Sequence, residues 1–172
     1  QEGQMPTPNV DYVFSAARSI VPVLRPGNII ILESTSPVGT TRAVAELLLA
    51  EGVDIDQLHI AYCPERVLPG RIMTELVEND RVIGGLTPAA SEKVAAFYRG
   101  FVKGEVLVTN AETAEMCKLT ENSFRDVNIA FANELSLLCA KSGVDVWELI
   151  GLANRHPRVN ILQPGVGVGG HC

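Results

Sequence analysis

Between Thr109 and Gly143 the chain contains neither proline nor glycine, and this uninterrupted stretch restricts the folds open to it. Thr109 and Glu112 fit a capping box, in which a threonine and a glutamate three positions later satisfy each other's backbone amides. Gly143 stands just past Lys141, where a helix-terminating glycine is expected. The sequence therefore predicts one helix of about 32 residues, about 48 Å long, which exceeds a crossover within a compact α/β unit. We expect this helix to connect domains or to build a dimer.

The segments before the long helix alternate between amphipathic and buried patterns. The run Asn-Ile-Ile-Ile-Leu at residues 28–32 is typical of a parallel strand that is covered on both faces. Alternating helices and buried strands predict a doubly wound α/β sheet with right-handed crossovers. Strands are predicted at residues 28–32, 59–62, 81–83 and 105–109, and helices at residues 10–24, 38–50, 88–101 and 144–153. We divide the chain into an α/β part, residues 1–109, and a helical part with a loop, residues 110–172.

Charge and hydropathy exclude some classes of partner. The 172 residues carry a net charge of -6 and no run of Lys or Arg, which argues against a nucleic-acid or anionic-membrane surface. No apolar stretch approaches the roughly 20 residues that span a bilayer, and residues 1–8 do not resemble a signal peptide. We therefore expect a cytoplasmic protein.

The four cysteines show no pair or cluster at zinc-ligand spacing, so neither a disulfide nor a structural metal is expected. Cys63, Cys117 and Cys139 lie in apolar-rich segments, where a free cysteine behaves as a small hydrophobic residue. Cys172 differs, because it follows Gly-Gly-His and has no bulky neighbours that would bury it. We expect the sulfur of Cys172 to be within reach of a ligand.

Residues 165–170 formally match the dinucleotide fingerprint GxGxxG, but the context is wrong. A phosphate-binding turn follows a strand, opens a helix and is answered by an acidic residue about 20 positions later. This stretch instead follows Gln163 and Pro164, and the sequence ends two residues after it. We interpret the glycines as allowing the backbone to approach a ligand closely, with a plain flexible tail as the alternative.

Polar residues at two strand ends and on the long helix form the candidate site. Residues 33–37 follow one predicted strand and residues 63–66 follow another, and open α/β sheets bind ligands at the carboxyl ends of their strands. Ordinary turns or a surface ion pair are the alternative interpretation. Lys118, Asn122 and Arg125 are spaced i, i+4, i+7 and so project from one helix face, which is either a site or a solvated surface.

Four segments taken together, residues 33–40, 63–70, 118–125 and 167–172, resemble the ordered motifs of the UDP-glucose/GDP-mannose dehydrogenase family. The resemblance implies the second half of a Rossmann-type NAD-binding domain, followed by a long-helix central (6-phosphogluconate dehydrogenase-like) dimerisation domain. Family members also have a preceding βαβ unit with the true fingerprint and a following α/β domain. The resemblance thus implies a central fragment that is inactive alone.

The resemblance also assigns roles to residues. Cys172 would be the nucleophile, and the Lys118 ammonium and the Asn122 amide would stabilise oxyanion character at C6. Lys118 would also transfer protons and lower the pKa of the Cys172 thiol. Thr35 would contact the nicotinamide side of NAD and order a water, and Glu65 would be the base for thioester hydrolysis.

Further residues are candidates for sugar or phosphate contacts, and arginine suits a diphosphate because its planar fork binds two oxygens at once. These candidates are Arg66, the backbone of Val67, Arg125, His156 and Arg158. The last two are also candidates for reaching the site of a neighbouring subunit, because the long helix of the family pairs subunits.

The implied reaction is an NAD-dependent four-electron oxidation of the C6 alcohol of a UDP-sugar to the uronate through a cysteine thiohemiacetal and thioester. Residues 64–70 and 154–160 favour a UDP-N-acetylhexosamine, with UDP-N-acetyl-D-mannosamine first. UDP-glucose and UDP-N-acetylglucosamine are the alternative substrates. A β-hydroxyacid dehydrogenase, which has a similar Lys-xxx-Asn pair but needs no cysteine, and a noncatalytic dimerisation fragment are the alternative functions.

Overall fold

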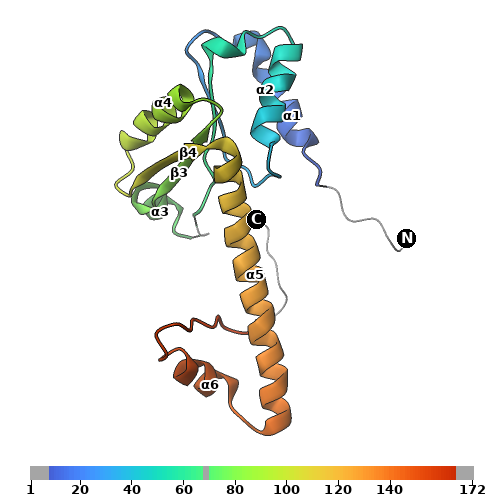
Figure 1. Cartoon of the computed structure of the whole chain (residues 1–172), viewed down its shortest axis with the longest axis vertical. Coiled ribbons are helices and arrows are strands. Elements are labelled where there is room, and N and C mark those ends of the chain that lie inside the picture. Colours follow the sequence, from blue (N-terminus) through green and yellow to red (C-terminus); the bar gives the residue numbers. More distant parts are fainter. Residues whose placement is uncertain (1–7, 68–69, 166–172) are drawn as a thin grey trace, which may run out of the picture. The chain divides into compact units, whose positions relative to one another are not determined.

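The computed structural model describes residues 8–67 and 70–165, and the chain divides into two compact units, Gln1–Leu119 and Thr120–Cys172 (Figure 1). The helix α5 begins in the first unit and ends in the second. In chain order the elements are α1 (Asp11–Ile20), η1 (Val21–Val23), β1 (Ile29–Leu32), α2 (Thr40–Ala50), η2 (Ile55–Gln57), β2 (His59–Tyr62), α3 (Ile72–Glu78), β3 (Arg81–Gly85), α4 (Pro88–Arg99), β4 (Val106–Asn110), α5 (Ala111–Ser142) and α6 (Val146–Ala153).

The four strands form one sheet in the order β1-β2-β3-β4. β1 pairs with β2 in parallel, and so does β3 with β4, in agreement with the expected fold class. The central pair differs from the expectation, because β2 and β3 are antiparallel, with Tyr62 opposite Gly84. Among its described residues, the connection from β2 to β3 includes the short helix α3 and no longer helix, and β3 returns beside β2 in the antiparallel direction.

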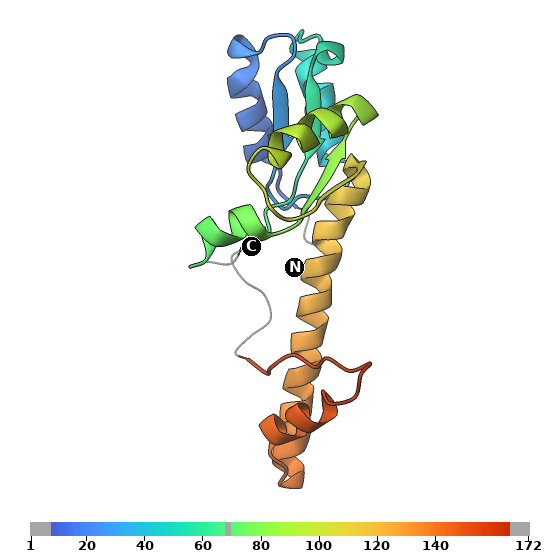
Figure 2. The ribbon, with the colours of Figure 1, turned by 90° about the vertical axis from the view of Figure 1, so that its left-hand side faces the viewer.

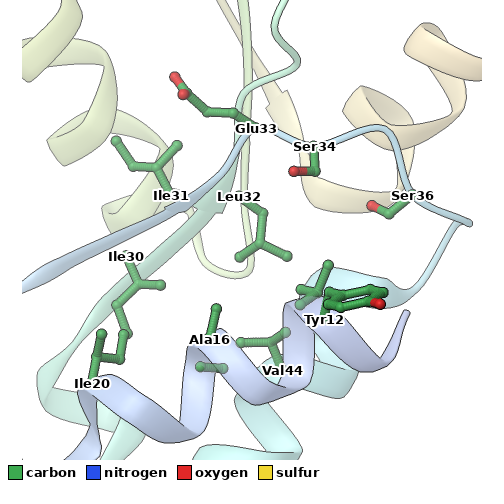
Figure 3. A pocket seen from close by; sticks show the side chains of 12 residues that line it. Tyr12, Ala16, Ile20, Ile30, Ile31, Leu32, Glu33, Ser34, Ser36 and Val44 are labelled. Carbon is green, nitrogen blue, oxygen red and sulfur yellow. The ribbon is translucent and has the colours of Figure 1, made fainter. Parts of the chain in front are cut away.

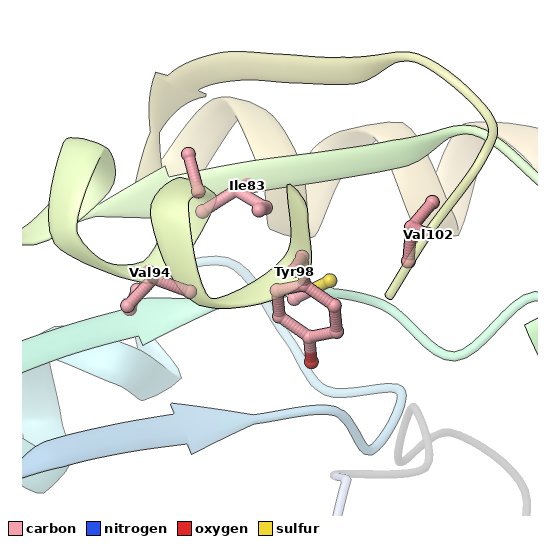
Figure 4. Packing of buried hydrophobic residues seen from close by; sticks show 7 residues of the cluster. Ile83, Val94, Tyr98 and Val102 are labelled. Atoms are coloured by element: carbon pink, nitrogen blue, oxygen red, sulfur yellow. The ribbon is translucent and has the colours of Figure 1, made fainter. Parts of the chain in front are cut away.

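Two apolar layers cover the sheet, and the alternation of β1 explains them. Ile29 and Ile31 pack against a buried cluster to which β2, β3 and α4 contribute. Figure 4 shows Ile83, Val94, Tyr98 and Val102 of this cluster. Ile30 and Leu32 point to the other face and pack against α1 and α2. Figures 1 and 2 show α4 on one side of the sheet and α1 with α2 on the other. A continuous apolar run in β1 is needed because both of its faces are covered.

The predicted elements agree with the structure to within a few residues, with two exceptions. The helix α3 was not expected, although its apolar residues recur at helical spacing, because it has only seven residues and most of them are exposed. The predicted capping box of the long helix is wrong. Thr109 lies in β4, and the Asn110 side chain accepts the hydrogen bond from the amide of Thr113 at 2.8 Å. The carboxylate of Glu112 pairs with Arg42 instead.

The expected length of the long helix and the expected burial of the three described cysteines are confirmed. α5 has 32 residues. Cys63 and Cys139 are buried and Cys117 is half-buried, which suits their apolar surroundings. Within the described ranges, no helix has the length and apolar character needed to cross a membrane.

Candidate active site

The segments that follow β1 and β2 are tied together at the edge where both parallel strands end. The amide of Cys63 donates to the carbonyl of Leu32 at 2.9 Å, and the amide of Glu65 donates to the carbonyl of Glu33 at 3.2 Å. The buried Tyr62 adds a hydrogen bond from its hydroxyl to the carbonyl of Ser34 at 3.2 Å. The sheet ladder therefore continues into the two polar segments and holds them side by side.

Lys118 of α5 reaches the segment after β2. Its Nζ donates to the carbonyl oxygen of Glu65 at 2.8 Å, and both residues are half-buried. The Glu65 side chain turns back, and its Oε1 accepts a hydrogen bond from the amide of Val67. The structure thus brings Lys118 to two residues of a motif that lies about 50 positions earlier, Glu65 and Val67.

Arg66, the next residue of the same segment, is held toward the start of β3. Its Nη1 donates to the carbonyl of Asp80 at 3.3 Å, and its own carbonyl accepts from Nδ2 of Asn79 at 3.3 Å. This double link fixes the backbone of residue 66 beside the start of β3.

The loop after β1 combines an exposed and a buried hydroxyl. Thr35 is exposed, whereas Ser36 is only 4% exposed and its Oγ has no hydrogen-bond partner among the residues that the structure describes. Ser34 and Ser36 line a pocket of about 340 Å³ whose other walls are mainly apolar side chains of α1 and β1. Figure 3 shows Ile30 and Leu32 directed into this pocket and Glu33 directed away from it. The pocket offers an apolar surface with hydroxyls at one end.

Glu33 points instead to the other face of the sheet, where it accepts a hydrogen bond from the hydroxyl of Tyr98 at 2.6 Å. Burial, followed by this hydrogen bond to Glu33, raises the pKa of Tyr98. The Arg81 guanidinium lies over the Tyr98 ring, with Cζ 5.7 Å from the centroid. Burial also raises the pKa of the Cys63 thiol, which remains protonated at neutral pH. Cys63 is therefore a packing residue and a poor nucleophile.

Sequence reasoning missed Glu115, a carboxylate that is fully buried on α5. It accepts hydrogen bonds from the amide of Gly39 at 2.6 Å, the amide of Thr41 at 2.8 Å and the hydroxyl of Thr41 at 2.6 Å. Ala111 and Ala114 on the same helix are also buried. An acidic residue beside these small apolar residues was the one feature of the sequence that could have pointed to a buried carboxylate. That signal does not identify the partners, which lie 74 to 76 positions away.

The remaining candidate residues belong to the second unit. Asn122 is half-buried and Arg125 is exposed, both on α5, where they keep the predicted spacing from Lys118. His156 and Arg158 are exposed in the segment after α6, and the amide of Arg158 donates to Nδ1 of His156 at 3.3 Å. The predicted nucleophile Cys172 lies outside the described residues.

A sheet with helices on both faces, and with polar segments at the end of its parallel strands, is the arrangement of an α/β nucleotide-binding domain. Comparison with known proteins makes the class specific. Residues 1–102 match the NAD binding domain of the UDP-glucose/GDP-mannose dehydrogenase family, and residues 112–172 match the central domain of the same family. The chain belongs to this family.

Individual relatives narrow the comparison. The chain is 64% identical over 174 residues to the UDP-N-acetyl-D-mannosamine dehydrogenase of Escherichia coli, covering 96% of this chain and 41% of the relative. It is 59% identical, with the same coverage, to an NDP-N-acetyl-D-galactosaminuronic acid dehydrogenase of Ralstonia nicotianae. The solved UDP-D-ManNAc dehydrogenase of Pyrococcus horikoshii is 51% identical with a TM-score of 0.92, over 96% of this chain and 40% of that one. The chain thus spans about two fifths of these relatives.

The first unit has features that fit a nicotinamide dinucleotide. The orphaned Ser36 hydroxyl is buried at the end of β1, where open α/β sheets bind nucleotides. The apolar wall formed by Ile30 and Leu32 offers a surface for a planar ring, and the exposed Thr35 hydroxyl lies in the same loop. This combination of hydroxyls and apolar side chains suits one wall of a dinucleotide site, and the described residues include no phosphate-binding glycine turn.

Proposed function

We propose that this chain forms the middle of an NAD-dependent dehydrogenase that oxidises the C6 alcohol of a UDP-N-acetylhexosamine, UDP-N-acetyl-D-mannosamine first, to the uronate. The observation that carries the proposal is the hydrogen bond from Lys118 Nζ to the carbonyl of Glu65, which joins two motif segments into one cluster. Relatives that are 59–64% identical carry names of dehydrogenases for N-acetylated sugar nucleotides, which supports this substrate class.

The proposed reaction consumes one C6 alcohol, one water and two NAD+, and it yields one carboxylate, two NADH and three protons. NAD+ supplies the hydride acceptor for each of the two oxidations. An aldehyde can donate a hydride to the second NAD+ only after a nucleophile has added to its carbonyl carbon. The proposal therefore needs a nucleophile between the two oxidations.

Cys172 is the proposed nucleophile. Its thiolate would add to the C6 aldehyde to give a thiohemiacetal, loss of hydride would give a thioester, and water would release the carboxylate and restore the thiol. The buried and protonated Cys63 is a poor alternative, and the buried Cys139 shares its inaccessibility. Cys117 is half-buried on α5 and lies in no family motif.

Residues of the cluster have proposed roles that suit their contacts. The ammonium of Lys118 would leave the carbonyl of Glu65 and stabilise negative charge on the C6 oxygen, together with the Asn122 amide. Glu65 would accept a proton from the hydrolytic water after its carboxylate leaves the Val67 amide. Thr35 would orient the nicotinamide side of NAD and a water.

Arginine and backbone groups are proposed to bind the nucleotide sugar. Arg66 stands next to Glu65 and has its backbone fixed by Asn79, which suits a sugar or phosphate contact. The Val67 backbone is proposed to act beside it. Arg125, His156 and Arg158 are proposed as further contacts, the last two with a neighbouring subunit.

We also propose a homodimer through α5. Phe124, Val127, Phe131 and Leu138 of this helix are each more than half exposed, at 59%, 66%, 52% and 59%. Such a row of large apolar side chains is costly to leave in water. Light scattering of the full-length protein at micromolar concentration is expected to give twice the monomer mass, and a monomer would contradict the proposal. A cytoplasmic location remains a prediction of the sequence.

The test of the function uses the full-length protein with NAD+ and four substrates: UDP-N-acetyl-D-mannosamine, UDP-N-acetylgalactosamine, UDP-N-acetylglucosamine and UDP-glucose. We expect two NADH per sugar and the highest kcat/KM with the mannosamine. A higher kcat/KM with another sugar would show that UDP-N-acetyl-D-mannosamine is not the preferred substrate. Absence of NADH with all four would support a noncatalytic role, and activity on β-hydroxyacids would support that class of enzyme. The chain alone is expected to be inactive.

The covalent step has its own test in the full-length protein. Cys172→Ser should bind NAD and sugar as before, but the second oxidation should slow by orders of magnitude, because a serine hydroxyl is almost fully protonated at neutral pH. Mass spectrometry of this variant is expected to show a slowly hydrolysed sugar adduct on residue 172. Conversion of the sugar to the uronate by Cys172→Ala at the parent rate would refute the thioester route.

A further inference from the structure

We infer that Glu115 is a positioning residue of the dehydrogenase: its carboxylate fixes the start of α2 to the first turns of α5, and so sets Thr35 and Lys118 relative to each other. The inference rests on the proposed function, in which Thr35 orients the nicotinamide and Lys118 serves the C6 oxygen. Glu115 itself touches neither group and acts through the backbone.

The start of α2 lacks a cap of its own. Its N-cap residue is Gly39, which has no side chain and a φ of 95°, so no side-chain oxygen of the N-cap accepts the first amides of the helix. The amide of Thr40 donates to the carbonyl of Pro37 at 3.2 Å, which leaves the amides of Gly39 and Thr41 for another acceptor. Glu115 replaces the cap from 74 to 76 positions away and accepts from both Gly39 and Thr41. A carboxylate at a helix N-terminus is also favoured by the helix dipole. The hydroxyl of Thr41 supplies a third donor.

The same contact fixes the loop that carries Thr35. Thr40 closes the turn before α2, with its hydroxyl donating to the carbonyl of Pro37 at 2.7 Å. At the other end of the loop, Tyr62 donates to the carbonyl of Ser34. Thr35 therefore lies in a short loop that is held at one end by the sheet and at the other by Glu115.

On the side of α5, Glu115 precedes Lys118 by three positions, so the two side chains lie on neighbouring parts of the helix surface. Glu115 is 0% exposed, whereas Lys118 is half-buried and reaches Glu65. A buried hydrogen-bonded group fixes the helix register better than an exposed ion pair does. We therefore infer that Glu115, rather than the neighbouring ion pair of Arg42 and Glu112, fixes the position of α5 at Lys118.

That neighbouring pair provides a matched control. Arg42 and Glu112 also join α2 to α5, at 2.6 Å, but their side chains are 57% and 37% exposed. Glu112→Gln changes the same atoms on the same helix one turn earlier. If any loosening between the two helices slowed the reaction, Glu112→Gln and Glu115→Gln would act alike.

The experiment is a single-turnover measurement in the full-length protein, with enzyme in excess over UDP-N-acetyl-D-mannosamine and saturating NAD+. Glu115→Gln puts an amide where a buried oxygen accepts, so a donor faces a backbone donor. We expect the rate constant of the first hydride transfer to fall about tenfold or more, because displacements of about 1 Å cost about a hundredfold. The dissociation constant of NAD should stay within about threefold.

The rate constant at saturating enzyme separates positioning from mere instability. Because the sugar limits the amplitude of NADH formation, an unfolded fraction leaves both the amplitude and this rate constant unchanged while folded enzyme stays in excess, whereas misplacement lowers the rate constant. Glu112→Gln should keep the parent rate constant. Thr41→Val should slow the step and Thr41→Ser should restore it, which supplies a second test if Glu115→Gln does not fold. A rate constant for Glu115→Gln equal to that of Glu112→Gln would overturn the inference.

A second measurement is independent of catalysis. Hydrogen exchange of the peptide covering residues 33–43 is expected to accelerate in Glu115→Gln and not in Glu112→Gln, because a carboxamide keeps only one accepting oxygen and the amide of either Gly39 or Thr41 loses its acceptor. If the parent protein forms no NADH with any sugar, the proposed function fails, but hydrogen exchange still tests whether Glu115 fixes the start of α2. Unchanged exchange in Glu115→Gln would overturn the inference by itself.

Discussion

Replacement of Lys118 by methionine separates its structural contribution from its proposed chemical one. Methionine keeps an unbranched apolar stem and removes the ammonium, so the hydrogen bond of 2.8 Å to the carbonyl of Glu65 is lost. Both residues are half-buried, so water can take the place of the ammonium. The loss of this hydrogen bond should lower the free energy of unfolding by about 0.5–1.5 kcal/mol.

The proposed chemical role predicts a larger effect on the reaction. A preorganised donor to a developing oxyanion contributes about 2.7–4 kcal/mol to the transition state, which corresponds to a loss of about 10²–10³ in kcat. Because the charge on the C6 oxygen is greatest in the transition state, KM should change by less than about threefold. The effect on kcat would thus exceed what the structural hydrogen bond alone explains.

The assay is steady-state NADH formation by the full-length protein, with circular dichroism to confirm folding. Lys141→Met is the matched control, because Lys141 is an exposed lysine in the last turn of the same helix. Lys141→Met should keep the parent kcat. If Lys118→Met also kept kcat within about threefold, Lys118 would belong to a solvated helix face and the oxyanion argument would be refuted.

Two further predictions concern the stability of the first unit, at Gly84 and at Tyr98. Gly84→Ala would place Cβ 2.2 Å from the carbonyl oxygen of Asn110, so chemical denaturation should show a free energy of unfolding that is lower by roughly 1–3 kcal/mol or more. Gly151→Ala in α6 is the control: a Cβ there meets nothing within 4 Å, so this change should be neutral or stabilising. The raised pKa of Tyr98 implies that unfolding releases its proton above pH about 10, so the free energy of unfolding is fully retained below that pH and falls above it by about 1.4 kcal/mol per pH unit. Tyr98→Phe should remove this added slope, and an identical slope in both proteins would contradict the assignment.

Local patterns in the sequence were sufficient for most elements, whereas Thr35, Glu65 and Lys118 received their roles from the resemblance of their segments to the family motifs. The apolar run of β1 and the length of α5 could each be inferred from a few neighbouring positions. Those inferences work because secondary structure and strand ends depend on short-range sterics and on periodic burial. The roles assigned to these residues remain predictions.

The sequence by itself determined where the chain is helical or extended and which motif residues stand near strand ends. Only the tertiary structure decided that β3 runs antiparallel to β2, that Asn110 rather than Thr109 caps α5, and that Glu115 caps α2. Each of these choices depends on groups that meet across the fold. Pairing with β3 extends β4 through Asn110, so α5 begins only at Ala111 and Asn110 stands at its cap, while Glu115 finds its donors 74 to 76 positions away. A hydrogen bond between such distant positions exists only after the sheet and the helices have packed.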